Sequence, residues 1–387
     1  MTHSNQPRTT GRSIVLLREN AVNEGVRTLA STTRTRGTDD IVSFENLGVA
    51  VVDVPPEELA DASGDDSPIL AVEPERYVYA LGEPTSKMTA ARSVTSQAEF
   101  DESHVTWGLQ ATGVANLKPN VDGSGIRVAI LDTGIDFKHP DFQGRSIVSK
   151  SFIDGEEVQD GDSHGTHCAG TSCGSNKPSQ LPRYGIAYNA SLYVGKVLAN
   201  DGSGSDSSVL QGIEWAIANR CDIISMSLGG SVEPGEPFSQ VYETVAKRAL
   251  NRGTLIIAAA GNSSDRNNGI RNPVNSPANC PSIMAVAALD SQLQVAYFSD
   301  AGINPDGGHV DIAGPGVDVY SSVPLLGKYD RFNGTSMATP HVAGIAALYA
   351  QVTGLRGREL WWILTQNAQR LDLFTSDVGI GLVQAPK

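Results

Sequence analysis

The sequence is poor in cysteine, and its few cysteines are not spaced as a disulfide framework or a zinc site. Four cysteines in 387 residues are too few for a disulfide scaffold, although an even number permits pairing. Cys168 and Cys173 lie five positions apart in a predicted helix and therefore point to different faces. No Cys-x-x-Cys pair indicates zinc. We expect free thiols at Cys168, Cys173, Cys221 and Cys280.

Long apolar runs and an excess of basic residues are also missing. No run approaches the roughly 18 apolar residues of a membrane-spanning helix, which excludes a membrane span. With 29 Lys and Arg against 43 Asp and Glu, the net charge is −14, so nucleic acid and anionic membranes are poor partners. The first residues lack the apolar core of a secretory signal. A cytoplasmic location and export by another route both remain open.

The chain divides into regions of different pattern. We expect a disordered N-terminus at 1–11, a small domain at 12–81, a polar linker at 82–105 and a larger domain at 106–387. In the small domain, helical stretches alternate with predicted strands at 13–17, 48–54, 69–72 and 77–79. This order of elements predicts a small α/β sandwich.

In the larger domain, short apolar runs alternate with helical stretches. The predicted strands lie at 126–131, 191–195, 223–227, 254–260 and 283–287. Such alternation predicts an α/β fold, with a mostly parallel sheet covered by helices on both faces. Ligands of these sheets bind beyond the carboxyl ends of the strands, so polar residues at these ends are candidate site residues.

The most informative segment is 334–341, Gly-Thr-Ser-Met-Ala-Thr-Pro-His, which precedes a run of small apolar residues. We expect Gly334 to allow a tight turn, and Pro340 to lie in the first turn of the buried helix that follows. Ser336 would then lie at the helix start, where free backbone N–H groups stabilise negative charge. This environment suits a nucleophile whose substrate develops an oxyanion. An ordinary helix cap is the alternative interpretation.

Strand ends and a helix start supply the other candidate residues. Asp132 follows the strand at 126–131, where a buried carboxylate needs a partner such as an imidazole or the amides of a turn. His164 begins a helix and can face the cleft, whereas His167, one turn further on, is expected to be a packed structural histidine. A zinc ion shared by the two histidines would need further ligands. Asn262 follows another strand, and its side-chain amide can donate to an oxyanion or form a turn.

The order Asp132, His164, Ser336 and the residues around each resemble the subtilisin-like serine peptidases, the subtilases, over nearly all of residues 106–384. The resemblance implies that Asp132 orients His164, that His164 is the general base, and that Ser336 attacks the peptide carbonyl to form an acyl-enzyme. Asn262 and the backbone N–H of Ser336 would form the oxyanion hole. It implies a serine endopeptidase that acts on proteins or peptides and needs no cofactor for its chemistry.

The resemblance also assigns the substrate-binding residues. The substrate backbone would pair with one strand made of Ser227, Leu228, Gly229 and Gly230, and the facing wall would be Ala259, Ala260 and Gly261. Because this binding contacts the main chain, we expect broad specificity. Cys168 resembles the proteinase K branch of the family, in which a thiol lies near the catalytic histidine. Met337 beside Ser336 predicts sensitivity to peroxide.

Residues 12–81 resemble the subtilase propeptide, a ferredoxin-like α+β domain that assists folding and acts as an intramolecular inhibitor until it is cleaved off. We therefore expect a zymogen that cleaves itself near Leu81, and a preference for large apolar residues before the cut. Asp141 keeps the position of one usual calcium ligand, so structural calcium is an expectation. The segment 175–183, however, departs from the calcium loop of many subtilases.

Two other functions remain as alternatives. A specialised processing peptidase or transpeptidase would use the same site, but the insertions that it would need to exclude water are not evident. A latent form, held inhibited by its own propeptide, would act as a binding module. Substitution of a triad residue would favour that role, and all three residues are present.

Overall fold

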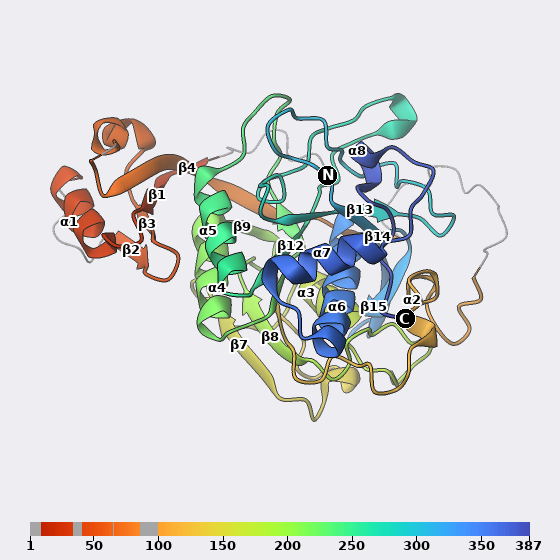
Figure 1. Ribbon diagram of the computed structural model, residues 1–387. Coiled ribbons are helices and arrows are strands. Elements are labelled where there is room, and N and C mark those ends of the chain that lie inside the picture. The colour runs from red at the N-terminus through yellow and green to blue at the C-terminus, as the bar shows by residue number, and fades with distance from the viewer. Residues whose placement is uncertain (1–8, 34–40, 65, 86–99) are drawn as a thin grey trace.

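The computed structural model describes residues 9–33, 41–64, 66–85 and 100–387. A small antiparallel sheet lies beside a large parallel sheet, and one long strand runs from the small sheet across the large domain (Figure 1). Residues 1–8 of the expected disordered N-terminus and residues 86–99 of the expected linker lie outside the described residues. None of the helices in the described ranges has both the length and the apolar character needed to cross a membrane.

The small domain is built from β1 (Thr9–Leu17), α1 (Val22–Thr32), β2 (Ile41–Phe44), β3 (Val49–Val52), the 3-10 helix η2 (Pro56–Ala62) and β4 (Ile69–Ala80). Its sheet is antiparallel, in the order β2, β3, β1, β4. Val15 and Leu17 of β1 and Leu29 of α1 share one buried apolar cluster. β1 begins at Thr9, so residues 9–11 belong to a strand and not to the disordered N-terminus that we expected. The strand predicted in two pieces is continuous in β4.

Seven strands form the large sheet, in the order β14, β13, β12, β10, β6, β8, β7, and every neighbouring pair is parallel. Their bounds are β6 (Arg127–Asp132), β7 (Ile147–Ser151), β8 (Ser191–Lys196), β10 (Ile223–Met226), β12 (Leu255–Ala259), β13 (Met284–Leu289) and β14 (Ile312–Pro315). Five of the seven match the predicted strands. The two that the sequence did not predict, β7 and β14, lie at the edges.

Helices cover both faces of the large sheet, as predicted (Figure 1). α3 (His164–Cys173) packs against α6 (Thr335–Thr353), and α6 packs against β10, β12, β13 and β14. α4 (Asp206–Ala218) packs against β6 and β8, and α5 (Gln240–Asn251) packs against β12. The other helices within the described ranges are α2 (Trp107–Ala111), α7 (Gly357–Asn367), α8 (Thr375–Val378) and the 3-10 turns η4 (Val114–Asn116), η5 (Pro140–Phe142) and η6 (Arg266–Asn268).

The small residues of α6 allow it to pack closely against its neighbours. A Cβ on Gly344 would lie 2.9 Å from the carbonyl oxygen of Ser172 in α3, so a larger residue there would separate the two helices. α6 begins at Thr335, and Pro340 therefore lies in its second turn, one turn deeper than we expected. At this depth a proline removes an internal helix hydrogen bond.

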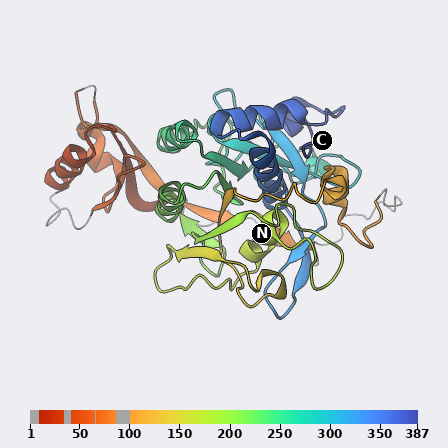
Figure 2. The same ribbon diagram turned by 60° about the horizontal axis from the view of Figure 1, so that its bottom comes forward.

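β4 leaves the small sheet and runs across the large domain (Figure 2). Its C-terminal part pairs antiparallel with β9 (Ser203–Ser205) on one side and β11 (Leu228–Gly229) on the other. The chain continues into β5 (Glu83–Pro84), which pairs with β16 (Tyr329–Asn333), itself paired with β15 (Val319–Ser322). The expected irregular linker therefore begins with a short strand, and residues 77–84 are bonded to the large domain along most of their length.

Candidate active site

Asp132 is the last residue of β6, and its side chain is fully buried. Its Oδ1 accepts from the backbone N–H of Thr133 at 2.7 Å and from Nδ1 of His164 at 2.8 Å. Both partners that we considered for this carboxylate, a turn amide and an imidazole, are therefore present. Its Oδ2 is buried and has no hydrogen-bond partner in the described part of the chain. One carboxylate oxygen thus holds the imidazole in a fixed orientation.

His164 is the first residue of α3, as predicted, and it too is buried. Burial alone lowers the pKa of His164, but the negative charge of Asp132 and the hydrogen bond between them raise it well above its usual value. Nε2 of His164 has no hydrogen-bond partner among the described residues. This nitrogen is therefore free to exchange a proton with a group in the cleft.

Ser336 lies in the first turn of α6. Its Oγ donates to the backbone carbonyl of Ser227 at 2.8 Å and not to Nε2 of His164. The structure therefore joins Asp132 and His164 by a hydrogen bond, but it does not join His164 and Ser336 by one. Both residues nevertheless face the same peptide bond, because a Cβ on Gly82 would lie 3.0 Å from Nε2 of His164 and the N–H of Ser336 points to the carbonyl of Leu81.

The carbonyl oxygen of Leu81 lies between two donors. It accepts from Nδ2 of Asn262 at 2.5 Å and from the backbone N–H of Ser336 at 3.4 Å. Oδ1 of Asn262 accepts from the N–H and the hydroxyl of Thr335, which fixes the direction of the amide. Gly334 has a φ of +155°, and a Cβ there would lie 2.3 Å from the Leu81 oxygen. Only glycine allows this close approach.

Ser227, Leu228 and Gly229 pair with residues 79–81, the part of the crossing chain (residues 77–84) that lies beside them. The backbone hydrogen bonds of Gly230 go to a different segment. Leu228 pairs with Ala80 and Gly229 with Tyr79, and Ser227 O accepts from the N–H of Leu81 at 3.3 Å. Gly230 exchanges two backbone hydrogen bonds with Ser276. Within the described ranges, the facing segment bonds to the surrounding protein and not to the crossing chain. Ala259 belongs to β12, and the described hydrogen-bond partners of Ala260 and Gly261 are Val286, Asn275, Asp300 and Thr335.

Sequence reasoning missed the strand on the other side of the crossing chain. β9 pairs with Tyr77, Val78 and Tyr79, and the carbonyl of Gly202 accepts from the N–H of Ala80 at 2.9 Å. Its sequence, Ser-Gly-Ser, has the composition of a loop. The sequence pattern also did not indicate the role of Thr335. It places Thr335 at a helix start, but only the structure shows that the Thr335 hydroxyl orients Asn262.

All four cysteines are free and buried, which confirms the expectation of free thiols. Sγ of Cys168 lies 3.9 Å from Nδ1 of His164 and donates to the carbonyl of Ser336 at 3.6 Å. His167 is a packed structural histidine, as expected. Its Nε2 donates to the carbonyl of Val319 at 2.9 Å, its ring stacks on Phe332, and burial lowers its pKa to about 3. Among the described residues, the side chains that converge closely enough with His164 to share a metal ion are Asp132 and Cys168, and His167 is not one of them.

Asp141, the candidate calcium ligand, already accepts hydrogen bonds from three protein donors. Its Oδ1 accepts from the N–H of Ser179 at 2.8 Å, and its Oδ2 accepts from the hydroxyls of Tyr184 at 2.6 Å and Tyr329 at 2.9 Å. The small pocket beside it is lined by Arg145 and Lys177, whose positive charges repel a divalent cation. The residues present therefore do not fit calcium at this carboxylate.

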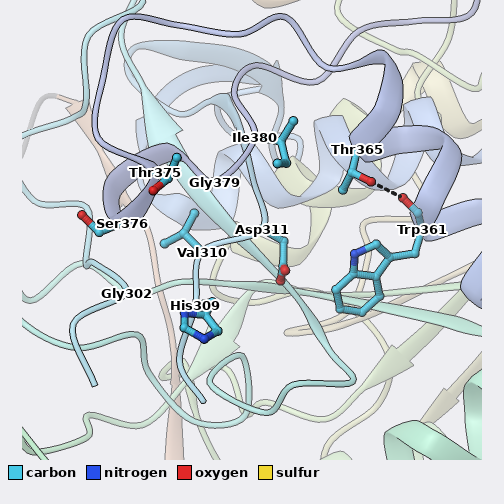
Figure 3. A pocket seen from close by; sticks show the side chains of 10 residues that line it. All are labelled: Gly302, His309, Val310, Asp311, Trp361, Thr365, Thr375, Ser376, Gly379 and Ile380. Atoms are coloured by element: carbon cyan, nitrogen blue, oxygen red, sulfur yellow. Dashed lines mark hydrogen bonds between the residues drawn. The ribbon is translucent and has the colours of Figure 1, made fainter. Parts of the chain in front are cut away.

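A separate pocket of about 430 Å³ contains none of the predicted site residues. Figure 3 shows its lining side chains, which come from α7, α8 and the chain around β14. Among them, burial raises the pKa of Asp311 to about 7, while one oxygen of this carboxylate accepts from the N–H of Ala285 at 2.8 Å. This pocket is distinct from the cleft around Leu81.

Comparisons with known proteins agree with this geometry. A model of the subtilase family matches residues 123–381. Subtilisin E of Bacillus subtilis (strain 168) is 45% identical over 228 residues, which are 58% of this chain and 55% of that protein. An alkaline protease of Alkalihalobacillus alcalophilus is 39% identical over 312 residues, 80% of this chain and 70% of that protein. M-protease of Shouchella clausii (strain KSM-K16) is 41% identical over 291 residues, 73% of this chain and 69% of that protein.

The match to the first of these relatives is partial, since the chain spans about half of the length of subtilisin E. The likeness of Cys168 to the proteinase K branch stays a prediction. The family model nevertheless covers well over half of the chain, including the carboxyl end of β6, the start of α3 and the start of α6. The chain belongs to the subtilase family.

Proposed function

We propose that this protein is a serine endopeptidase that hydrolyses peptide bonds in proteins or peptides through Asp132, His164 and Ser336. The observation that carries the proposal is the position of the Leu81 carbonyl oxygen, between Nδ2 of Asn262 and the N–H of Ser336. Two converging donors at a carbonyl are what a tetrahedral oxyanion requires. His164, oriented by Asp132, lies against the next residue of the same chain.

In the proposed mechanism, the Ser336 hydroxyl turns from the carbonyl of Ser227 to Nε2 of His164, which takes its proton. Oγ then attacks the carbonyl carbon, and the oxyanion forms between Asn262 and the Ser336 N–H. His164 returns the proton to the leaving amine as the C–N bond breaks, which leaves an acyl-enzyme. Water, deprotonated by His164, then attacks the acyl carbon. The bond to Ser336 Oγ breaks, His164 returns the proton to Oγ, and the acid is released. Asp132 stabilises the imidazolium through the bond at Nδ1, and no cofactor is needed.

We further propose that residues 12–81 are a propeptide that inhibits the enzyme from within the same chain, and that self-cleavage occurs between Leu81 and Gly82. Support comes from the pairing of β4 with β9 and β11 and from the pairing of β5 with β16, which hold the chain on both sides of this bond. After cleavage the strand contacts of β4 would persist, so the cut propeptide would remain an inhibitor until it dissociates.

We propose broad specificity, with a preference for a large apolar residue at the position of Leu81. Main-chain pairing with β9 and β11 does not depend on substrate side chains. The Leu81 side chain lies against Gly229, since a Cβ there would come 3.2 Å from Leu81 Cδ1. Peptide libraries cleaved by the trimmed enzyme should show enrichment of leucine, phenylalanine and methionine there, and equal cleavage after charged residues would contradict the preference.

The serine-peptidase proposal is tested by labelling with a fluorophosphonate and by digestion of casein. Wild type should be labelled and should digest casein, whereas Ser336→Ala should do neither. One observation favours the latent alternative, because the uncleaved chain fills the cleft. Wild-type protein that folds but remains unlabelled and full length would support that alternative and contradict peptidase activity. Product analysis with an added amine would reveal a transpeptidase.

A further inference from the structure

The backbone carbonyl of Ser336 lacks its usual helix donor. In an α-helix a carbonyl accepts from the N–H four residues further on, and for Ser336 that residue is Pro340, which has no N–H. Ser336 is fully buried, so water does not replace this donor. A buried carbonyl without a partner costs about 1–3 kcal/mol. The protein must supply a donor from outside the helix.

The hydroxyl of Ser227 is that donor. Ser227 Oγ donates to the carbonyl of Ser336 at 2.8 Å. The thiol of Cys168 also points to this oxygen, at 3.6 Å, but a thiol is a weak donor. Ser227 is buried, with 1% of its surface exposed, and it lies between β10 and β11. Its position is thus set by the large sheet and not by the helix that carries the nucleophile.

The two serines are joined in both directions. While Ser227 Oγ donates to the Ser336 carbonyl, Ser336 Oγ donates to the Ser227 carbonyl, also at 2.8 Å. The same Ser227 carbonyl accepts from the N–H of Leu81. The Ser227 carbonyl therefore contacts both the chain in the cleft and the proposed nucleophile, whereas the Ser227 hydroxyl is the stronger of the two side-chain donors to the Ser336 carbonyl.

We propose that the Ser227 hydroxyl is a positioning residue for the nucleophile: by holding the Ser336 carbonyl it fixes the first turn of α6, and with it the Oγ and the N–H that face the substrate. The inference rests on the proposed function. Without this hydroxyl the first turn loses its strong external donor, and small displacements of reacting groups cost up to about a hundredfold in rate. Binding of substrate backbone is preserved, because it uses the Ser227 carbonyl.

The test compares three variants of the full chain by the first-order rate of cleavage after Leu81. Ser227→Ala should slow cleavage about tenfold to a hundredfold, and Ser227→Thr, which keeps the hydroxyl, should recover most of the rate. The matched control is Ser225→Ala on β10, since the Ser225 hydroxyl is equally buried and has no partner in the described chain. It should cleave at the wild-type rate.

A second readout separates positioning from a merely structural role. In the trimmed enzymes, Ser227→Ala should lower kcat for a peptide substrate by the same factor by which it slows self-cleavage. Its KM should stay within about twofold of the wild-type KM. An unchanged rate, a loss no larger than that of Ser225→Ala, or a loss confined to KM would overturn the inference. If Ser227→Ala does not fold, Ser227→Cys, with its weaker donor, takes its place with the same expected direction. Wild type that does not cleave would instead overturn the proposed function.

Discussion

The side-chain amide of Asn262 donates a hydrogen bond of 2.5 Å to the carbonyl oxygen of Leu81. The amide is held in place from its other end, where Oδ1 accepts from the backbone N–H and the hydroxyl of Thr335. A donor that is fixed before the reaction loses little energy to reorganisation when negative charge develops on its acceptor. This arrangement makes Asn262 the strongest candidate for electrostatic stabilisation of the transition state.

Replacement of Asn262 by alanine should therefore lower kcat by about 10²–10³-fold, the established loss for such a donor in subtilisin, with a small effect on KM. Steady-state kinetics on a peptide substrate provide the measurement. Asn268→Ala is the control, because Asn268 lies in an exposed turn and bonds only to Asp265 in the described structure. A similar loss in both variants would contradict a specific role for Asn262.

Gly82 should be required for rapid self-cleavage. A Cβ at this position would lie 2.9 Å from Sδ of Met337 and 3.0 Å from Nε2 of His164. Met337 is flexible enough to move, but displacement of His164 would disturb its bond to Asp132. Gly82→Val should slow cleavage after Leu81 by at least about tenfold, measured as the rate at which the trimmed product appears on a gel.

The control for Gly82 is Gly64→Ala in the small domain, where a Cβ would meet no atom within 4 Å. This variant should cleave at the wild-type rate. Equal rates for Gly82→Val and wild type would show that the chain is not cleaved in the geometry described for Leu81 and Gly82.

The Asp141 cluster should stabilise the protein without calcium. Asp141→Asn removes an acceptor from a buried set of hydrogen bonds with Tyr184 and Tyr329, so the free energy of unfolding should fall by about 1–3 kcal/mol. Thermal unfolding with calcium and with a chelator should shift wild type and variant equally. Calcium that stabilises wild type but not Asp141→Asn would show that this carboxylate is a calcium ligand.

Asp311 should make stability depend on pH. Burial raises its pKa from 3.8 to about 7 in the folded protein, so Asp311 is protonated when folded at pH 5 and loses that proton on unfolding. The contribution of this carboxyl to the free energy of unfolding is fully present below pH 4 and is lost as the pH rises towards 7. Asp311→Asn should flatten the decline of the urea midpoint over this range, whereas the exposed control Asp154→Asn should not. An identical decline in wild type and Asp311→Asn would contradict this assignment.

The sequence predicted the central strands of the large sheet because they are buried on both faces and read as apolar runs. It did not predict β7, an edge strand whose burial alternates along Ile147–Ser151, or β14, which contains a glycine and a proline. β9 was missed for a different reason, since a Gly- and Ser-rich segment becomes a strand only when β4 pairs with it. Its structure depends on a partner that is distant in the sequence.

At the site, the sequence indicated which residues carry chemistry but not how their hydroxyls are bonded. Asp132 ends a strand, His164 begins a helix and Asn262 follows a strand, so their places could be inferred from those elements. The bond from Ser336 to the carbonyl of Ser227 depends on the rotation of a hydroxyl among competing acceptors, which only the packed structure decides. The donors that satisfy Asp141 likewise come from distant tyrosines.

Self-cleavage by Ser336 is tested most directly by intact-mass analysis of purified wild type and Ser336→Ala after refolding. Wild type should yield a species that begins at Gly82, while Ser336→Ala should fold and stay full length. A wild-type chain that remains intact, or a Ser336→Ala chain that is cut at the same bond, would contradict self-cleavage by Ser336 in the cleft that Leu81 occupies.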